Sequence, residues 1–275
     1  MSLQTNEKQY RLGFIGGGKL AGSVIRGLVR AKSCPPEEIL VSEPNEPART
    51  ALGEELAGIG LTAENAEVAE GAEVILLGVK PGVVLGVIAG MAEGIAGKLV
   101  ISLAAGTRLA NMEEKAEARF MRAMTNTPAA VCQAATAIAR GARTTEEDME
   151  KARRIFSSIG TVVTVEEKEI DAVTALSGSG PAFVYSVIEA LAEGGKRCGL
   201  TEKVSLGLAT QTVRGAAQLA LESGLSPEEL RRMVITPGGT TAAGLAKMEQ
   251  IGSAAGLAAA VEAASAKARE LASGR

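Results

Sequence analysis

The stretch RLGFIGGGKLAGSVIRGL, residues 11–28, decides the fold class. A short apolar run leads into three glycines, and an amphipathic stretch with helical spacing follows them directly. Gly16, Gly18 and Ala21 fit the pattern GxGxxA, in which the glycines permit a tight turn and the close approach of a phosphate, and the third small residue permits close helix packing. Such a turn also occurs for packing alone, so the motif by itself leaves both interpretations open.

Short apolar runs alternate with amphipathic stretches between residues 11 and 165. This alternation is typical of βαβ units, and it predicts a mainly parallel sheet with helices on both faces. In that context the glycine-rich turn favours dinucleotide binding. The expected strands lie in RLGFIG, EILVSE, EVILLGV, KLVISLA, RFMRAM, ATAIAR and TVVTV, and the expected helices span 20–31, 47–57, 83–91 and 146–157.

The pattern changes near residue 167, since the chain from Ile170 onward is nearly all helix-forming. Gly199 and Gly224 are in positions that end helices, and Ser226 with Glu229 has the spacing of a capping box. We therefore predict an α/β domain over residues 1–166 and an all-α domain over residues 167–275.

Composition excludes several classes of partner. The 275 residues contain no histidine and carry a formal charge of −3, and 2% are aromatic, which disfavours nucleic acid and anionic membrane as partners. Cys34, Cys132 and Cys198 are scattered without a CxxC motif, so we expect neither a metal site nor a disulfide framework. The polar N-terminus and the lack of a long apolar run lead us to expect a cytoplasmic protein with no membrane segment.

Small or polar residues follow several of the expected strands, where ligands of such sheets bind. Glu43 ends the second strand, where a carboxylate can accept hydrogen bonds from the adenosine ribose and would repel a 2′-phosphate, so it suggests NADH. The alternative is that Glu43 only faces solvent. Gly78–Pro81, Ser102–Gly106 and Met124–Pro128 follow three further strands, and together they are expected to form the floor for a nicotinamide ring.

Two glycine-rich segments interrupt the helical half. Ser177–Ala182 reads SGSGPA and is expected to open a helix whose free N–H groups suit a carboxylate. Thr236, Thr240 and Thr241 flank Gly238 and Gly239, which are expected to offer backbone N–H groups at a second helix start.

At these residues the sequence resembles the pyrroline-5-carboxylate reductase family. The shared motifs are GFIGGGKLA, VKP, SLAAG, MTNTP, DAVTALSGSGPAF, EALAEGG and PGGTT, which follow the family's order and cover almost the whole chain. The joint presence of MTNTP, SGSGPA and PGGTT is specific, whereas GxGxxA fits many dehydrogenases.

The resemblance implies an α/β Rossmann-type N-terminal domain followed by an all-α C-terminal dimerisation domain. It implies homodimers with interlocked helical domains, higher homo-oligomers built from them, and an active site at the dimer interface. The implied reaction transfers hydride from NAD(P)H, with NADPH frequent in the family, to the C=N bond of 1-pyrroline-5-carboxylate and gives L-proline. The cofactor contacts implied by the resemblance and by the strand ends are Ile15, Gly16, Gly17, Gly18, Lys19, Leu20, Glu43, Asn65, Gly78, Val79, Lys80, Pro81, Leu103, Ala104, Ala105 and Asn126. The implied substrate contacts are Glu167, Ser177, Gly178, Ser179, Gly180, Thr236, Gly239, Thr240 and Thr241, with Thr241 as the proton-donating residue.

Two other functions stay open at this point. A related hydroxyacid dehydrogenase normally has a catalytic lysine, and SGSGPA has none within several residues. A dinucleotide-sensing protein would keep the glycine-rich turn but would need neither SGSGPA nor PGGTT. Reduction of a cyclic imine suits a chain without histidine, because a protonated imine is already a strong electrophile.

Overall fold

The computed structural model describes residues 9–272, which belong to two compact units. The sheet unit contains the chain up to Ser179 together with the segment from Ala264, and the helical unit contains Gly180–Ala263. This division lies later in the chain than the predicted boundary at 166/167, because residues 167–179 and the end of the last helix pack with the sheet unit.

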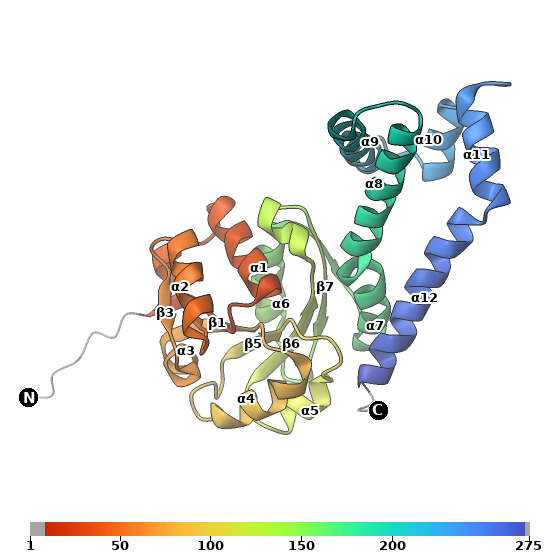
Figure 1. Ribbon diagram of the computed structural model, residues 1–275. Coiled ribbons are helices and arrows are strands. Elements are labelled where there is room, and N and C mark those ends of the chain that lie inside the picture. Colours follow the sequence, from red (N-terminus) through yellow and green to blue (C-terminus); the bar gives the residue numbers. More distant parts are fainter. Residues whose placement is uncertain (1–8, 273–275) are drawn as a thin grey trace, which may run out of the picture. The chain divides into compact units, whose positions relative to one another are not determined.

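One eight-stranded sheet forms the centre of the sheet unit, in the order β3-β2-β1-β4-β5-β6-β7-β8 (Figure 1). Neighbouring strands are parallel from β3 to β6, β7 is antiparallel to β6, and β8 is parallel to β7. The parallel part has the strand order of a Rossmann fold, which confirms the predicted class. The strands are β1 Tyr10–Ile15, β2 Ile39–Ser42, β3 Gly60–Thr62, β4 Ala72–Leu77, β5 Leu99–Ser102, β6 Arg119–Met124, β7 Ala134–Arg140 and β8 Gly160–Thr164.

The sequence pattern locates every strand except β3, whose three residues are too few for an alternating pattern. The central strand β4 shows why the others are recognisable. Its Val74 and Leu76 enter one apolar core and its Ile75 and Leu77 enter the other, since successive side chains point to opposite faces.

Helices cover both faces of the sheet. One core receives residues from α1, α2 and α6, and the core on the other face receives residues from α3, α4 and α5. The carboxyl ends of the parallel strands are left for the loops that carry the predicted site. These helices are α1 Lys19–Arg30, α2 Glu46–Glu55, α3 Asn65–Gly71, α4 Val84–Gly90, α5 Leu109–Glu113 and α6 Glu146–Ser157.

A wide helical turn precedes the boundary between the units. The short helix α7 (Ile170–Val173) continues into a π-helical turn, Thr174–Gly178, and α8 (Gly180–Arg197) begins after Ser179. The predicted helix start at Ser177–Ala182 is thus only half right, because Ser177 and Gly178 already belong to the π-helical turn. The N–H of Ser179 donates to the carbonyl of Thr174 over 2.8 Å, so this amide is not free.

The helical unit contains α8, three further helices and the first part of a fourth, whose residues from Ala264 belong to the sheet unit. Gly199 and Gly224 have φ angles of +96° and +68°, and Ser226 and Glu229 form the predicted capping box. Many of its large apolar side chains are exposed in a single chain, as is typical of a surface that binds another protein. The further helices are α9 Glu202–Glu222, α10 Pro227–Met233, α11 Thr240–Gln250 and α12 Ser253–Ala272.

Candidate functional site

The glycine-rich turn after β1 is held between the ends of two neighbouring strands. Gly16 has a φ of +92°, and its N–H donates to the Ser42 carbonyl over 2.8 Å. On the other side, the N–H of Gly78 donates to the Ile15 carbonyl over 2.8 Å. A side chain at Gly16 would be strained at this φ, so the backbone conformation requires glycine there.

Gly18 is the N-cap of α1 and leaves the start of the helix open. No side chain caps the helix, and a Cβ built on Gly18 meets no atom within 4 Å. The first-turn N–H groups of a helix have no acceptor within the helix, and the helix dipole adds positive potential. The open space and the unused donors fit a pyrophosphate, as the fingerprint predicts.

Glu43 lies at the end of β2, beside this loop, as predicted. One of its carboxylate oxygens accepts the N–H of Gly17 over 3.1 Å, and the other accepts the N–H of Asn45 over 3.1 Å. Arg49 binds the backbone carbonyl of Glu43 over 2.7 Å, so its guanidinium does not neutralise the carboxylate directly. The second-strand end therefore presents a half-buried negative charge, and Glu43 does not merely face solvent.

A cleft of about 540 Å³ opens at the carboxyl ends of the parallel strands. It brings together the start of α1 and the residues after β4, β5 and β6, which sequence analysis assigned to the cofactor. The same cleft is bounded by part of the π turn, which was assigned to the substrate. Its lining residues are Gly18, Lys19, Leu20, Gly78, Val79, Lys80, Pro81, Leu103, Ala104, Ala105, Met124, Thr125, Asn126, Thr127, Thr174, Gly178 and Ser179.

Thr174 is the cleft residue that sequence reasoning overlooked. It lies one helical turn before Gly178, so the spacing of residues on one helix face was a signal that could have found it. Its hydroxyl donates to the Ile170 carbonyl over 2.7 Å, and its own carbonyl accepts the Ser179 N–H. Thr174 therefore both shapes the π turn and contributes to the cleft wall.

Several predicted residues lie outside the cleft lining. Asn65 begins α3, accepts a hydrogen bond from the Ser42 hydroxyl over 2.7 Å and lines a separate hollow beside α4. Ile15, Gly16 and Gly17 form the backbone behind the start of α1, and Ser177 bonds to the Val173 carbonyl through its hydroxyl.

Glu167 was predicted to contact substrate, yet its carboxylate is already bound within the sheet unit. Its Oε1 accepts the N–H of Leu109 over 2.7 Å and lies 3.3 Å from Nη1 of Arg122. Arg122 is buried, and burial lowers the pKa of its guanidinium while the carboxylates of Glu167 and Asp171 oppose that change. These contacts tie the segment just before α7 to Leu109 and Arg122 of the sheet unit, and the contact of Glu167 with substrate stays a prediction.

The second glycine-rich segment forms a helix start in the helical unit, as predicted. Gly239 is the N-cap of α11 with no side-chain cap, and Gly238 before it has a φ of +72°. The Gly239 N–H donates to the Thr236 carbonyl over 2.9 Å, so this amide is not free, contrary to the prediction. A Cβ at Gly239 would collide with the Thr236 hydroxyl. Thr240 and Thr241 occupy the first turn of α11, while Gly180 begins α8.

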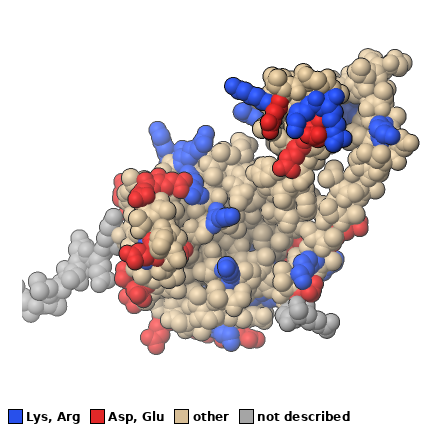
Figure 2. Space-filling model, viewed as in Figure 1, with Lys and Arg blue, Asp and Glu red and all other residues tan. Residues whose placement is uncertain are grey.

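On the face shown in Figure 2, acidic and basic side chains are interspersed. Among residues 9–272, no group of three or more His, Cys, Asp or Glu side chains could hold a metal ion. No helix in that range is both long and apolar enough to span a membrane.

Comparison with known proteins gives consistent matches along the chain. Residues 167–271 match the family model for pyrroline-5-carboxylate reductase dimerisation, and residues 11–106 match that for coenzyme F420-dependent NADP oxidoreductase. A pyrroline-5-carboxylate reductase of Glycine max is 44% identical over 266 residues, which cover 96% of this chain and 97% of the relative.

Solved structures of the same name share the fold over nearly the full length. The Plasmodium falciparum pyrroline carboxylate reductase with NADP bound has a TM-score of 0.87 at 28% identity, covering 97% of this chain and all (100%) of that chain. The Coxiella burnetii pyrroline-5-carboxylate reductase has a TM-score of 0.86 at 33% identity, covering 96% of this chain and 99% of that chain.

Proposed function

The chain belongs to the pyrroline-5-carboxylate reductase family, and we propose that its cleft binds the nicotinamide cofactor while the π turn and the residues around PGGTT bind the substrate. Membership makes the protein an NAD(P)H-dependent oxidoreductase that reduces 1-pyrroline-5-carboxylate to L-proline, the last step of proline biosynthesis. One observation supports the site assignment above the others. The open start of α1 and the π turn line the same cleft, so residues assigned to cofactor and to substrate adjoin one hollow.

The start of α1 holds the cofactor phosphates in this proposal. Gly18 leaves room for the pyrophosphate, and the first-turn N–H groups donate to its oxygens. The strand ends at Gly78–Pro81 and Leu103–Ala105 form the floor of the site. When bound there, the reduced nicotinamide supplies the hydride.

The chain's own task in catalysis is to bind and orient. The substrate imine is basic enough to be protonated near neutral pH, so no strong acid is needed beside it. Backbone N–H groups at the start of α11 are donors for the substrate carboxylate, and correct orientation of two reactants lowers the barrier greatly. The hydroxyl of Thr241 is placed in the same helical turn and hydrogen-bonds the ring nitrogen or relays its proton from water.

Replacing Thr241 with Ala tests its role. We expect kcat for pyrroline-5-carboxylate reduction to fall by about 100-fold, the lower end of what one proton-handling group usually contributes, while the cofactor Kd changes less than about twofold. Thr241→Ser retains a hydroxyl and is expected to recover most of the activity. Loss of NAD(P)H absorbance measures turnover, and unchanged kcat in the alanine variant would remove Thr241 from the mechanism.

Glu43 is proposed to select NADH over NADPH, because a 2′-phosphate would meet its carboxylate. Glu43→Gln retains an acceptor for the Gly17 N–H but removes the charge. We expect the wild type to have the higher kcat/KM with NADH, and the variant to shift that ratio toward NADPH by about tenfold, which corresponds to about 1.4 kcal/mol. A strong NADPH preference in the wild type would contradict this assignment.

Assembly and location complete the proposal. Residues 167–271 match a dimerisation model, so the protein forms a homo-oligomer. We propose that the dimer interlocks through its helical regions, that higher oligomers are built from such dimers, and that the active site lies at the dimer interface. Exposed leucines such as Leu221, 74% exposed in the single chain, support association through the helical regions. In light scattering, the Leu221→Glu variant should have a smaller particle mass than the wild type. The free state of all three cysteines agrees with a cytoplasmic location.

A further inference from the structure

Asn126 joins two backbone groups at the base of the cleft. Its Nδ2 donates to the carbonyl of Ser177 in the π turn over 3.0 Å. Its Oδ1 accepts the N–H of Ala135, the second residue of β7, over 3.1 Å. Asn126 is buried, with only 6% of the residue exposed.

A primary amide satisfies both neighbours at once at any pH near neutral. The carbonyl of Ser177 requires a donor and the N–H of Ala135 requires an acceptor, and an amide carries one of each on separate atoms. A carboxylate would satisfy Ala135 but would place a negative oxygen against the Ser177 carbonyl. The orientation of the amide therefore follows from its two partners. The second hydrogen on Nδ2 is the donor that the Asn126 side chain still has for a ligand.

Asn126 provides a side-chain hydrogen bond between the π turn and the sheet. The Ser177 hydroxyl donates to the Val173 carbonyl over 3.1 Å, and the Ser179 N–H donates to the Thr174 carbonyl over 2.8 Å. These bonds set the internal shape of the turn but do not fix its distance from the sheet. The bond from Asn126 ties the Ser177 carbonyl to the end of β6 and the start of β7.

We propose that Asn126 is a positioning residue, which fixes the π turn against the sheet so that Gly178 and Ser179 face bound substrate, and not chiefly a residue that binds the cofactor. The inference rests on the proposed function, since the same cleft must hold cofactor and substrate. It differs from the prediction from sequence that placed Asn126 among the cofactor contacts, and the experiment below distinguishes the two roles. A shift of the turn by about 1 Å is enough to lower turnover by about 100-fold.

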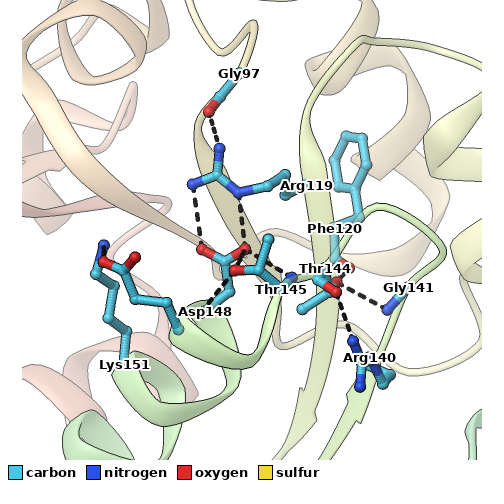
Figure 3. A network of polar contacts seen from close by, with 10 residues as sticks. Gly97, Arg119, Phe120, Arg140, Gly141, Thr144, Thr145, Asp148 and Lys151 are labelled. Carbon is cyan, nitrogen blue, oxygen red and sulfur yellow. Dashed lines mark hydrogen bonds and ion pairs between the residues drawn. The ribbon is translucent and has the colours of Figure 1, made fainter.

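Thr144 provides a matched control at the opposite end of β6 (Figure 3). Its hydroxyl donates to the Phe120 carbonyl over 2.8 Å and accepts the Gly141 N–H over 3.0 Å, and Thr144 is 4% exposed. Like Asn126, Thr144 is a buried side chain that joins two backbone groups. Thr144→Val removes two such bonds without touching the cleft.

The experiment compares Asn126→Asp, Asn126→Ala and Thr144→Val with the wild type in the full-length protein. We expect both Asn126 variants to lose about 10- to 100-fold in kcat, to bind NADPH and NADH within about twofold of wild type, and to exchange amide hydrogens faster at residues 174–179. Thr144→Val should lose thermal stability to a similar degree but keep wild-type kcat. Asn126→Ala introduces no charge, so it still tests the positioning role if the aspartate variant does not fold.

The pH dependence of kcat distinguishes loss of the hydrogen bond to Ser177 from general damage to the fold. When the new carboxylate of the Asn126→Asp variant is protonated, it regains an O–H donor for Ser177. The ratio of variant to wild-type kcat should therefore rise as the pH is lowered, and the alanine variant should show no rise. Lys19 and Lys80, the charged residues of the described cleft lining, are common to all the variants, so the ratio removes their effect.

The outcomes separate the two proposals. Wild-type protein that fails to reduce pyrroline-5-carboxylate overturns the proposed function. If the wild type is active, the positioning role is refuted by Asn126 variants with wild-type kcat, by a loss confined to cofactor affinity, or by a loss no greater than that of Thr144→Val.

Discussion

Asp148 offers the sharpest test of how the sheet unit is held together. Its two carboxylate oxygens accept hydrogen bonds from Nε of Arg119 over 2.8 Å and from Nη2 over 3.2 Å (Figure 3). The backbone N–H and the hydroxyl of Thr145 donate to the same carboxylate over 3.0 Å and 2.8 Å. Asp148 thus joins the start of α6 to β6, and its replacement by asparagine removes the charge that both elements share.

The expected loss of stability follows from burial. Removing one partner of a fully buried ion pair costs about 3–5 kcal/mol. Here Asp148 is buried, but the Arg119 side chain is 31% exposed and also donates to the Gly97 carbonyl, so water and a second partner reduce the cost. The side-chain amide of the Asp148→Asn variant would still accept one bond from Thr145, and we expect a loss of about 2 kcal/mol at neutral pH.

The pH dependence has a definite sign. Burial tends to raise the pKa of Asp148, but the hydrogen bonds from Arg119 and Thr145 outweigh it, so the pKa lies below its usual value. A carboxyl with a lowered pKa in the folded state contributes its full stability above the unfolded pKa of about 3.9 and loses it as the pH falls toward the folded pKa. The difference between wild type and Asp148→Asn should therefore be constant from neutral pH to about pH 5 and shrink below about pH 4.

Urea denaturation at one protomer concentration measures this difference, because unfolding of an oligomer depends on concentration. Glu150→Gln, which breaks an exposed ion pair with Arg153 on the same helix, is the control and should change stability by less than about 0.5 kcal/mol. A loss for Asp148→Asn equal to that of the control, or one that does not change down to pH 3 (roughly one unit below the usual Asp pKa), would refute the reasoning.

Three further predictions concern other buried groups. Burial raises the pKa of the Cys34 thiol to about 11, so a thiol-specific disulfide reagent at neutral pH should modify Cys34 only after denaturation, and rapid modification of the folded protein would contradict its burial. In Gly78→Ala the new Cβ would lie 2.6 Å from the Cβ of Ala21, so calorimetry should show weaker cofactor binding and a lower Tm, whereas wild-type values would mean that close packing is not required there. Arg122→Met removes a buried partner of Glu167, and we expect the free energy of unfolding, measured with urea, to fall by about 2 kcal/mol. An unchanged free energy would contradict this and would mean that the cost of burying the unpartnered nitrogens of Arg122 cancels the gain from the ion pair.

Local sequence determined the sheet and its ligand edge. The runs that become β1, β4 and β5 are short and mainly apolar, and this pattern is a property of neighbouring residues alone. Gly16 likewise follows from local chemistry, since its φ of +92° admits glycine most readily. The cleft lining could be predicted in large part for the same reason, because ligands bind where parallel strands end.

Tertiary structure decided the hydrogen-bond partners of the polar side chains. Asn126 and Glu167 carry groups that suit a ligand, and their sequence positions beside known motifs favoured that assignment. Their partners, Ser177, Ala135, Leu109 and Arg122, lie in other elements, and only the folded chain brings these donors and acceptors within hydrogen-bond distance. Backbone conformation depends mainly on residues that are adjacent in the chain. The hydrogen-bond partner of a buried polar side chain is often distant in the sequence, so it is determined by how the elements pack in the folded protein.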